Sequence, residues 1–217
     1  MTAKPPSRSA TEVLDHLVYA TPDLERTIEE FAQRFGVRAS TGGQHVGMGT
    51  RNALLALGPR SYLEIAGADS SQPTPAAPRW FGIDSLDAPR LVTWAAHGAS
   101  LETFQASAAS DGVAVGELTA GSRERPDGVT LRWTNTSPRA MLADGLAPFF
   151  IDWESSPHPA ASAASGLTIV ELRAEHPDPG YVTRTLVALG IDLRVDHADV
   201  PALVAILRGP NGDIELR

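Results

Sequence analysis

Length, composition and charge restrict the classes of protein that this sequence fits. The chain has 217 residues, of which 42% are hydrophobic and 20% charged, as in an ordinary globular protein. Its formal net charge is −8, from 18 Lys and Arg against 26 Asp and Glu. An acidic surface without a basic run repels nucleic acid and anionic membranes, so neither is expected as a partner.

The sequence lacks cysteine and any long apolar run, and this excludes several kinds of site. The sequence contains no cysteine, which excludes disulfides, thiolate metal sites and a cysteine nucleophile. It contains no run of 18 apolar residues, so no membrane-spanning helix is expected. Residues 1–11 lack the apolar segment of a secretory signal and are predicted to form a flexible tail. A cytoplasmic location fits these features.

Residues 12–67 predict the element order β-α-β-β-β. The stretch LDHLVYA (14–20) is typical of a strand, and apolar residues follow it at helical spacing until Gly36 ends the helix. The residues on that helical face are Leu24, Ile28, Phe31 and Phe35. Three strand-like segments follow, around VRAST (37–41), TRNALLALG (50–58) and SYLEIAG (61–67).

The same order of elements is predicted twice more. A second unit is expected over residues 90–155, and a third, shortened unit over residues 167–217. Residues 68–89 and 156–166 are rich in Pro, Ala, Ser and Gly, as linkers are. One βαβββ unit leaves a sheet face exposed, so units are expected to pair. The predicted fold class is α+β, with repeated βαβββ units whose curved mixed sheets enclose a cavity.

Several stretches of the chain resemble the vicinal oxygen chelate superfamily, and more narrowly its glyoxalase-like members. These stretches are LDHLVYATPDLERT, GGQHVGMGTRNALLALGPRSYLEIAG, SRERPDGVTLRW and APFFIDWE. The resemblance implies the glyoxalase/bleomycin-resistance/dioxygenase fold and a small-molecule ligand. It does not imply one reaction, because the superfamily includes isomerases, lyases, dioxygenases, transferases and binding proteins.

His16 and Glu64 are the first candidates for a functional role. Strand parity places both on the concave side of the sheet, because their neighbours Leu17, Leu63 and Ile65 suit the helix. A neutral imidazole and a carboxylate on neighbouring strands make half of a metal site. The alternative is a His–Glu hydrogen bond that satisfies two half-buried groups.

The resemblance also implies where further metal ligands would lie. Metal enzymes of this superfamily take one ligand from the first strand and one from the last strand of a unit, and His16 and Glu64 match these positions. A divalent metal (Zn, Fe, Mn or Ni) is therefore the cofactor expected at His16 and Glu64. The matching positions of the second unit are Trp94 or Thr93, and Asp152 or Ile151.

Trp94 cannot bind a metal, so the second unit departs from the four-ligand pattern of glyoxalase I. The matching residues of the third unit, Glu171 and Glu215, are competent ligands. They would complete a set with His16 and Glu64 only if the third unit faced the first. Consecutive units are expected to pair instead.

A glycine-rich segment, TGGQHVGMGTRN (41–52), surrounds His45. Because glycines let the backbone approach a ligand closely, His45 is predicted to be a third ligand, a general base or a substrate donor. The alternative is an exposed histidine in a hairpin. Asn52 is predicted to offer its amide to the cavity or to cap the hairpin. His45 and Glu64 are the predicted catalytic residues.

The stretch GSRERPDGVTLRW (121–133) gathers arginines beside a tryptophan around a turn signal at Pro126-Asp127-Gly128. Arginine and tryptophan together can hold a carboxylate or an aromatic acid. The alternative is a solvated hairpin. The predicted substrate-binding residues are His45, Asn52, Arg123, Arg125, Trp133, Asp152 and Trp153. The other histidines, His97, His158, His176 and His197, are predicted to lie at the surface.

Two functions follow from the sequence. The first is a glyoxalase-like lyase, isomerase or dioxygenase whose divalent metal would stabilise an enolate or similar anion of a small oxygenated substrate. The second is a metal-free protein that sequesters a small ligand in the same cavity. Motifs of serine hydrolases and nucleotide-binding proteins are absent. Three units leave one without an obvious mate, so the third unit is expected either to pack on the flank of the first two or to meet its copy in a second chain. A homodimer is predicted.

Overall fold

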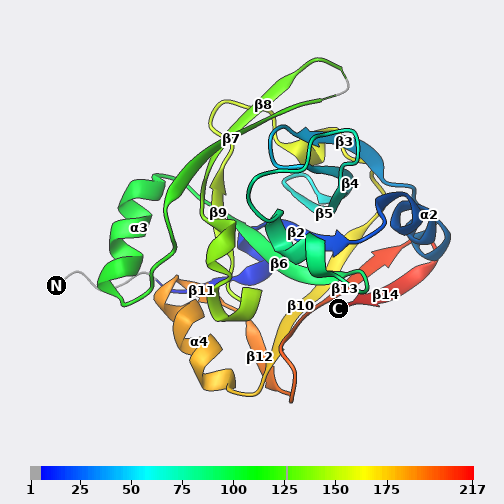
Figure 1. Ribbon diagram of the computed structural model, residues 1–217. Coiled ribbons are helices and arrows are strands. Elements are labelled where there is room, and N and C mark those ends of the chain that lie inside the picture. Colours follow the sequence, from blue (N-terminus) through cyan, green and yellow to red (C-terminus); the bar gives the residue numbers. More distant parts are fainter. Residues whose placement is uncertain (1–5, 126) are drawn as a thin grey trace.

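The computed structural model describes residues 6–125 and 127–217. Its main feature is one curved sheet of eight strands in the order β3-β4-β5-β2-β6-β9-β8-β7 (Figure 1). The first four strands and their helix are β2 (Leu14–Thr21), α2 (Leu24–Phe35), β3 (Ser40–His45), β4 (Thr50–Gly58) and β5 (Ser61–Ala68). The others are β6 (Arg90–His97), α3 (Leu101–Ser110), β7 (Leu118–Glu124), β8 (Thr130–Thr136) and β9 (Phe149–Asp152). The predicted α+β class is confirmed.

The first and second units join through their first strands. β2 runs parallel to β5 on one side and antiparallel to β6 on the other. At the far edges of the sheet, the Arg123 guanidinium on β7 donates to the Gly42 carbonyl on β3. The sheet is therefore nearly closed into a barrel, and its concave face forms an interior. This interior contains a second, smaller hydrophobic cluster that includes Val18, Leu54, Tyr62, Leu131 and Phe149.

Helix α2 shows how local sequence directs packing. Its N-cap is Asp23, whose side chain accepts a hydrogen bond from the Arg26 amide at 3.1 Å. Gly36 ends the helix with φ 75°, a conformation that glycine adopts without strain. The predicted apolar face, Leu24, Ile28, Phe31 and Phe35, is buried in the main core. Leu17, Leu63 and Ile65 lie in the same core, as strand parity predicted.

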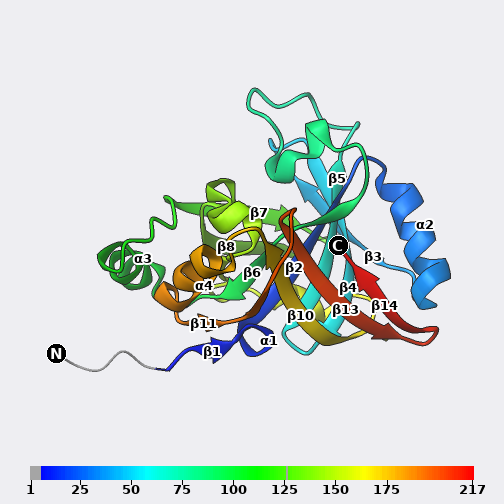
Figure 2. The same cartoon turned by 90° about the horizontal axis from the view of Figure 1, so that it is seen from below.

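The third unit forms a separate sheet in the order β12-β10-β13-β14. Its elements are β10 (Thr168–His176), α4 (Pro179–Ala188), β11 (Ile191–Asp192), β12 (Arg194–His197), β13 (Ala202–Gly209) and β14 (Gly212–Leu216). One face of this sheet, with Leu172, Ala174 and Leu203, joins the core on the convex side of the large sheet. Figure 2 shows β10 and β13 beside β2 and β4. The third unit thus packs on the flank of the first two.

The predicted tail of residues 1–11 is described from residue 6 onward, and there it is attached to the third unit. β1 (Arg8–Ser9) pairs with β11, and the short helix α1 (Ala10–Val13) follows. Ala10 and Val13 are buried in the main core, so apolar contact holds this segment in place. The predicted turn at residues 126–128 joins β7 to β8, although Pro126 itself lies outside the described residues.

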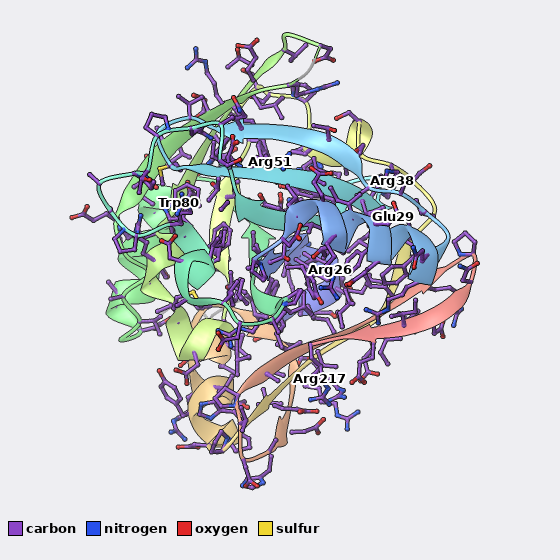
Figure 3. The ribbon with its side chains drawn as sticks, turned by 45° about the vertical axis from the view of Figure 1, so that its right-hand side comes forward. Arg26, Glu29, Arg38, Arg51, Trp80 and Arg217 are labelled. Carbon is purple, nitrogen blue, oxygen red and sulfur yellow. The ribbon has the colours of Figure 1, made fainter. Side chains whose placement is uncertain are left out.

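The segment between the first two units was predicted to be a linker, but it contains local structure. Its 3₁₀ helix, Trp80–Ser85, contains Phe81 at φ 61°, a backbone conformation that residues other than glycine rarely adopt. Figure 3 shows Trp80 on the same side of the molecule as the β7–β8 hairpin, away from α2. No described helix combines the length and apolarity needed to cross a membrane.

The outward face of the third sheet carries an ion-pair cluster. Glu175 lies at its centre and accepts hydrogen bonds from Arg217 at 2.7 and 2.9 Å and from Arg173. Arg217 also bonds Glu215 at 2.7 Å (Figure 3). The bonds from Arg217, and then those from Arg173, lower the pKa of Glu175 to about 2.

This cluster makes stability depend on pH. The pKa of Glu175 is depressed on folding, so its contribution is fully present above its unfolded pKa of about 4.3 and is lost as pH falls toward 2. Glu175→Gln should therefore lower the free energy of unfolding at pH 7, and the difference from the wild type should shrink at pH 3. Urea denaturation at pH 7, 5 and 3 measures this. The exposed Glu117→Gln is the control, and a pH-independent difference for Glu175→Gln would contradict the assignment.

Candidate functional site

The site begins at an irregularity in β2. The register against β6 shifts between Leu14 and His16, which makes Asp15 the extra residue of a β-bulge. Bulges redirect side chains, and here Asp15 faces the inner side of the sheet together with His16. Its carboxylate accepts hydrogen bonds from His16 Nδ1 at 2.7 Å and from Trp153 Nε1 at 3.0 Å. Asp15 and His16 are both buried.

Two more histidines donate to the same carboxylate. His97 Nδ1 lies 2.8 Å and His158 Nε2 lies 3.2 Å from Asp15 Oδ2. Burial opposes ionisation of Asp15, but the hydrogen bonds from His158, His16 and His97 outweigh it and lower its pKa far below the usual range. Asp15 is therefore a carboxylate anion whose donors come from both units and from the segment after β9.

The hydrogen bond to Asp15 determines how His16 faces the cavity. Because His16 Nδ1 carries the donated proton, its Nε2 atom presents a lone pair on the other side of the ring. That atom lies 3.7 Å from Glu64 Oε2. The imidazole stacks on Tyr62 with ring centroids 4.7 Å apart, which fixes its plane. Burial, aided by the charges of Glu64 and Asp15, raises the pKa of Tyr62 well above its usual range, so the phenol stays protonated.

His45 approaches the same carboxylate from the neighbouring hairpin. Its Nε2 atom lies 3.7 Å from Glu64 Oε1, and its Nδ1 atom lies 3.0 Å from Thr50 Oγ1. Burial lowers the pKa of His45, although the charge of Glu64 opposes that shift. The imidazole is therefore neutral near pH 7. Asn52 Nδ2 donates to Glu64 Oε1 at 2.6 Å and lies 3.3 Å from His45 Nε2, which leaves Nε2 as the unprotonated nitrogen.

The second unit supplies a cation and aromatic walls. Arg123 on β7 is buried, and Trp133 on β8 lies 5.3 Å from Trp153 between ring centroids. Gly121 makes room for Trp133, because a Cβ there would lie 2.4 Å from the indole ring. The full lining of this inner cavity is His16, His45, Asn52, Tyr62, Glu64, Trp80, Phe81, Arg123, Trp133, Asn135, Pro138, Phe149, Ile151 and Trp153.

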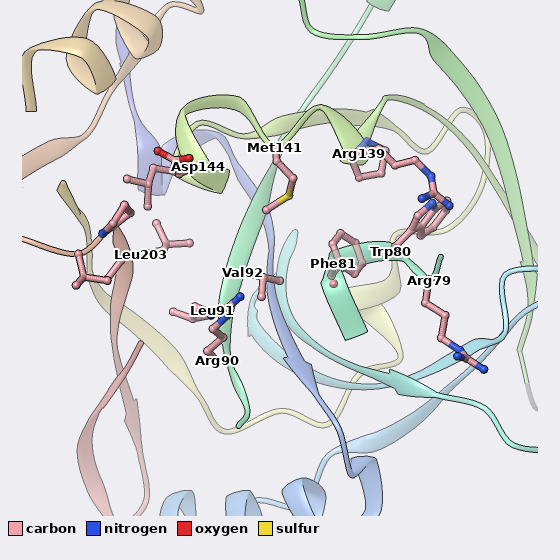
Figure 4. A pocket seen from close by; sticks show the side chains of 16 residues that line it. Arg79, Trp80, Phe81, Arg90, Leu91, Val92, Arg139, Met141, Asp144 and Leu203 are labelled. Carbon is pink, nitrogen blue, oxygen red and sulfur yellow. The ribbon is translucent and has the colours of Figure 1, made fainter. Parts of the chain in front are cut away.

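Two larger hollows adjoin the inner cavity. The inner space holds about 40 Å³, and an outer hollow of about 430 Å³ shares His45, Trp80 and Trp133 with it. A third hollow of about 550 Å³ lies between the Trp80–Phe81 segment and Leu203 of the third unit, against the start of β6 (Figure 4). The inner cavity thus shares walls with both larger hollows.

The structure places most of the predicted site residues in this cavity, but not Arg125 or Asp152. Arg125 pairs with Asp127 at 2.6 Å and lines a different hollow, which it shares with Arg123 and with residues of β3 and β4. On β9, Ile151 faces the cavity, so alternation turns Asp152 to the other side, where it accepts from the Glu154 amide. Substrate binding by Arg125 and Asp152 in this cavity is therefore not supported.

The second unit offers no metal ligand at its matching positions. Trp94 points into the main core, where its Nε1 atom donates to the Leu146 carbonyl at 2.9 Å. Thr93 lies opposite Val18 in the ladder and so takes the concave face. Glu171 and Glu215 belong to the third sheet, on the flank. The ligand set that included these two glutamates is therefore wrong.

Several cavity residues were not predicted from the sequence. Asp15 was missed, because regular alternation places it on the same face as Leu17 and cannot anticipate a bulge. Trp80 and Phe81 lie in a segment whose composition predicts a linker, and the only signal there is an aromatic pair within it. Tyr62 shares the parity of Glu64, which would have identified it. His97, His158 and His176 are partly or largely buried, and only His197 is exposed as predicted.

His16, His45 and Glu64 are residue types that a divalent metal binds. His16 Nε2 lies 3.7 Å from Glu64 Oε2, and His45 Nε2 lies 3.7 Å from Glu64 Oε1, so the two imidazoles approach different oxygens of one carboxylate. In the part of the chain that the structure describes, these three side chains do not place one ligand atom each within 4.8 Å of the others, so metal binding requires them to move closer together. Among the described residues, Asn52 Oδ1 is the buried side-chain atom without a partner.

A second group of ligand-type atoms suits a metal less well. One atom each of Asp15, His97 and His158 lies within 4.8 Å of the others. His158 Nδ1, however, accepts a hydrogen bond from the Ala160 amide at 3.2 Å. This bond places the imidazole proton on Nε2, where it is donated to Asp15 rather than replaced by a metal. We therefore assign this group to the hydrogen-bonded support of His16.

Comparison with known proteins agrees with this arrangement. Two βαβββ units share one curved sheet around a cavity, which is the arrangement that the resemblance found in the sequence implies. A family model described as a glyoxalase-like domain matches residues 14–190. The chain belongs to this glyoxalase-like family, which confirms the resemblance found in the sequence. No curated protein matches the sequence.

Solved structures with a similar fold share little sequence with this chain. A hypothetical protein from Staphylococcus aureus is 17% identical over 93% of this chain and 83% of its own, with a TM-score of 0.61. A methylmalonyl-CoA epimerase from Mycobacterium tuberculosis is 21% identical over 71% of this chain and 95% of its own, with a TM-score of 0.44. The similarity to the Staphylococcus aureus protein supports the fold and nothing further.

The position of Asp15 generates a stability prediction. Asp15→Asn removes the negative charge and places an amide N–H group against the N–H groups that now donate to the carboxylate. The free energy of unfolding should therefore fall by about 2–5 kcal/mol. Chemical denaturation at pH 7 measures the change. Asp87→Asn, at an exposed position, should change it by less than about 0.5 kcal/mol. Equal effects of the two substitutions would rule out a structural role for the Asp15 carboxylate.

Proposed function

We propose that this protein is a metal-dependent enzyme of the glyoxalase-like group that acts on a small oxygenated substrate. The observation that carries the proposal is that His16 Nε2 and His45 Nε2 each lie 3.7 Å from an oxygen of the buried Glu64 carboxylate. Two histidines and one carboxylate form a ligand set that leaves open positions on a divalent metal. A bound Zn, Fe, Mn or Ni ion would act there as a Lewis acid toward substrate oxygens.

The surrounding residues have separate parts in this proposal. Asp15 holds His16 in the tautomer that keeps Nε2 unprotonated, as carboxylates do for metal-bound histidines. Tyr62 stays protonated and can donate a hydrogen bond to a substrate oxygen. Trp133, Trp153 and Phe149 surround the polar centre with apolar walls and exclude water, which strengthens electrostatic interactions within the cavity.

The proposal leaves two kinds of reaction open. Glu64 and His45 were predicted as the proton-transferring residues of a lyase or isomerase, and the same triad suits iron in a dioxygenase. In either case the substrate approaches from the outer hollow, which His45 adjoins. The metal that is found in the protein separates these reactions, because oxygen chemistry requires iron or a comparable redox metal.

One observation favours the alternative of a metal-free binding protein. Asn52 already donates to Glu64 at 2.6 Å, so the carboxylate has a partner without any cation. The second unit adds no ligand from Thr93 or Ile151. A cavity of this kind would sequester a small ligand by its aromatic walls and Arg123. The homodimer and the cytoplasmic location remain predictions, and the place of the third unit on the flank means that the cavity needs no second chain.

Metal analysis tests the proposed function. Protein purified without chelator or added metal should contain about one equivalent of Zn, Fe, Mn or Ni, because three ligands converge in one chain. His16→Ala and Glu64→Gln should each weaken metal binding at least about tenfold, since each removes a ligand. His197→Ala, an exposed histidine far from the cavity, should retain the metal.

Thermal denaturation with and without EDTA gives an independent readout. Chelation should lower the Tm of the wild type and leave His16→Ala nearly unchanged, because a metal bound only by the native state stabilises it. Wild-type protein without metal, with a Tm that EDTA and added Zn, Fe, Mn or Ni do not change, would reject the enzyme proposal in favour of the binding protein.

A further inference from the structure

Within residues 6–125 and 127–217, Arg123 is a buried cation without an anionic partner. It is 4% exposed, and its guanidinium donates to the Gly42 carbonyl. In the described part of the chain no carboxylate lies within ion-pair distance of it, and Glu64 attracts it only through space. A buried charge is unfavourable unless it is paired, so an unpaired guanidinium in a cavity marks a place for an anion.

The Arg123 guanidinium has more N–H donors than the Gly42 carbonyl can accept from. It carries five N–H groups in a planar fork, and the carbonyl of Gly42 uses only some of them. Arg123 also lines the inner cavity beside Glu64 and Trp133. A planar carboxylate matches the guanidinium fork with two parallel hydrogen bonds.

The size and charge of the cavity favour a carboxylate over a phosphate. The inner space of about 40 Å³ exceeds the roughly 10–15 Å³ that one water molecule needs, so it holds a group of a few atoms. Glu64 adds a negative charge within electrostatic range of Arg123. This charge would repel a dianion more strongly than a monoanion, because the interaction scales with charge.

The walls indicate what the rest of the ligand is like. Trp133 and Trp80 line both the inner cavity and the outer hollow of about 430 Å³. Trp153 lies 5.3 Å from Trp133, and His45 lies 6.1 Å from Trp80, between ring centroids. Flat aromatic walls of this kind pack well against a planar, apolar group.

We propose that the cavity binds a small carboxylic acid with a planar apolar body. Its carboxylate pairs with Arg123, and its body extends past Trp133 and Trp80 into the outer hollow. The inference names the substrate class for the proposed function and shares its cavity. It does not depend on a metal, because Arg123 is not part of the ligand set.

Binding of mandelate and mandelamide tests the inference in the wild type. The two molecules have the same shape and aromatic body, but only mandelate carries a carboxylate. Mandelate should bind at least about tenfold more tightly, since a charge-assisted pair is lost with the amide. Isothermal titration calorimetry measures both affinities, and quenching of the cavity tryptophans reports the location. Equal affinities, or no mandelate binding at millimolar concentration, would overturn the inference.

Variants of the hairpin assign the effect to one residue. Arg123→Met should reduce mandelate affinity at least about tenfold and remove the preference over mandelamide. Arg132→Met is the control, because Arg132 lies on the same hairpin but is exposed. A preference that survives in Arg123→Met would refute the role of this residue. If Arg123→Met does not fold, the comparison of mandelate with mandelamide in the wild type still tests whether the cavity binds a carboxylate.

The same titrations with EDTA separate this inference from the metal proposal. A preference for mandelate that persists in EDTA supports Arg123 even if no metal is found. A preference that exists only with metal would assign the carboxylate to the metal and overturn the role of Arg123. Metal in the protein without any preference would leave the proposed function intact and reject the carboxylic acid.

Discussion

The buried carboxylate of Asp15 is the interaction on which the candidate site depends. It accepts hydrogen bonds from His16 on β2, His97 at the end of β6, Trp153 after β9 and His158 in the segment that follows. These donors belong to both units of the large sheet, so one anion joins the halves of the barrel. A buried charge needs such a set of donors, and here the donors include the histidine that faces the cavity.

The same anion connects fold and chemistry. Because Asp15 orients His16 from behind, the lone pair of His16 points at Glu64 without any contact from a ligand. His45 is oriented in the same manner by Thr50. The third unit stabilises this arrangement from the convex side, where its apolar face packs against the sheet that carries β2. The concave face is thereby left for the polar groups of the site. These groups can be buried because most of them form hydrogen bonds with one another.

The sequence predicts the part of the structure that regular patterns control. Periodicity placed Leu17, Leu63 and Ile65 in the main core and put His16 and Glu64 on the opposite face, because alternation holds along unbroken strands. The fold class and the resemblance to the glyoxalase-like family were confirmed. The location of a third unit on the flank was only one of two expectations, since the packing of whole sheets is not encoded in local periodicity.

The sequence fails where the backbone departs from such patterns or where partners are remote. A single bulge reverses the side on which Asp15 lies, and no local signal marks it. Trp80 reaches the cavity through a 3₁₀ helix in a segment whose composition is that of a linker. Arg125 has a local partner, Asp127, and therefore stays on the hairpin. Arg123, two residues earlier, faces the interior.

The covalent union of two barrel halves has a consequence for how such a protein evolves. In a barrel made from two identical subunits, symmetry would repeat every residue, so each cavity would appear twice with the same side chains. Here the halves are free to diverge. One supplies two imidazoles and a carboxylate, and the other supplies a guanidinium and indole rings, while each adds one amide. A single asymmetric compartment of this sort can distinguish the two ends of an unsymmetrical molecule.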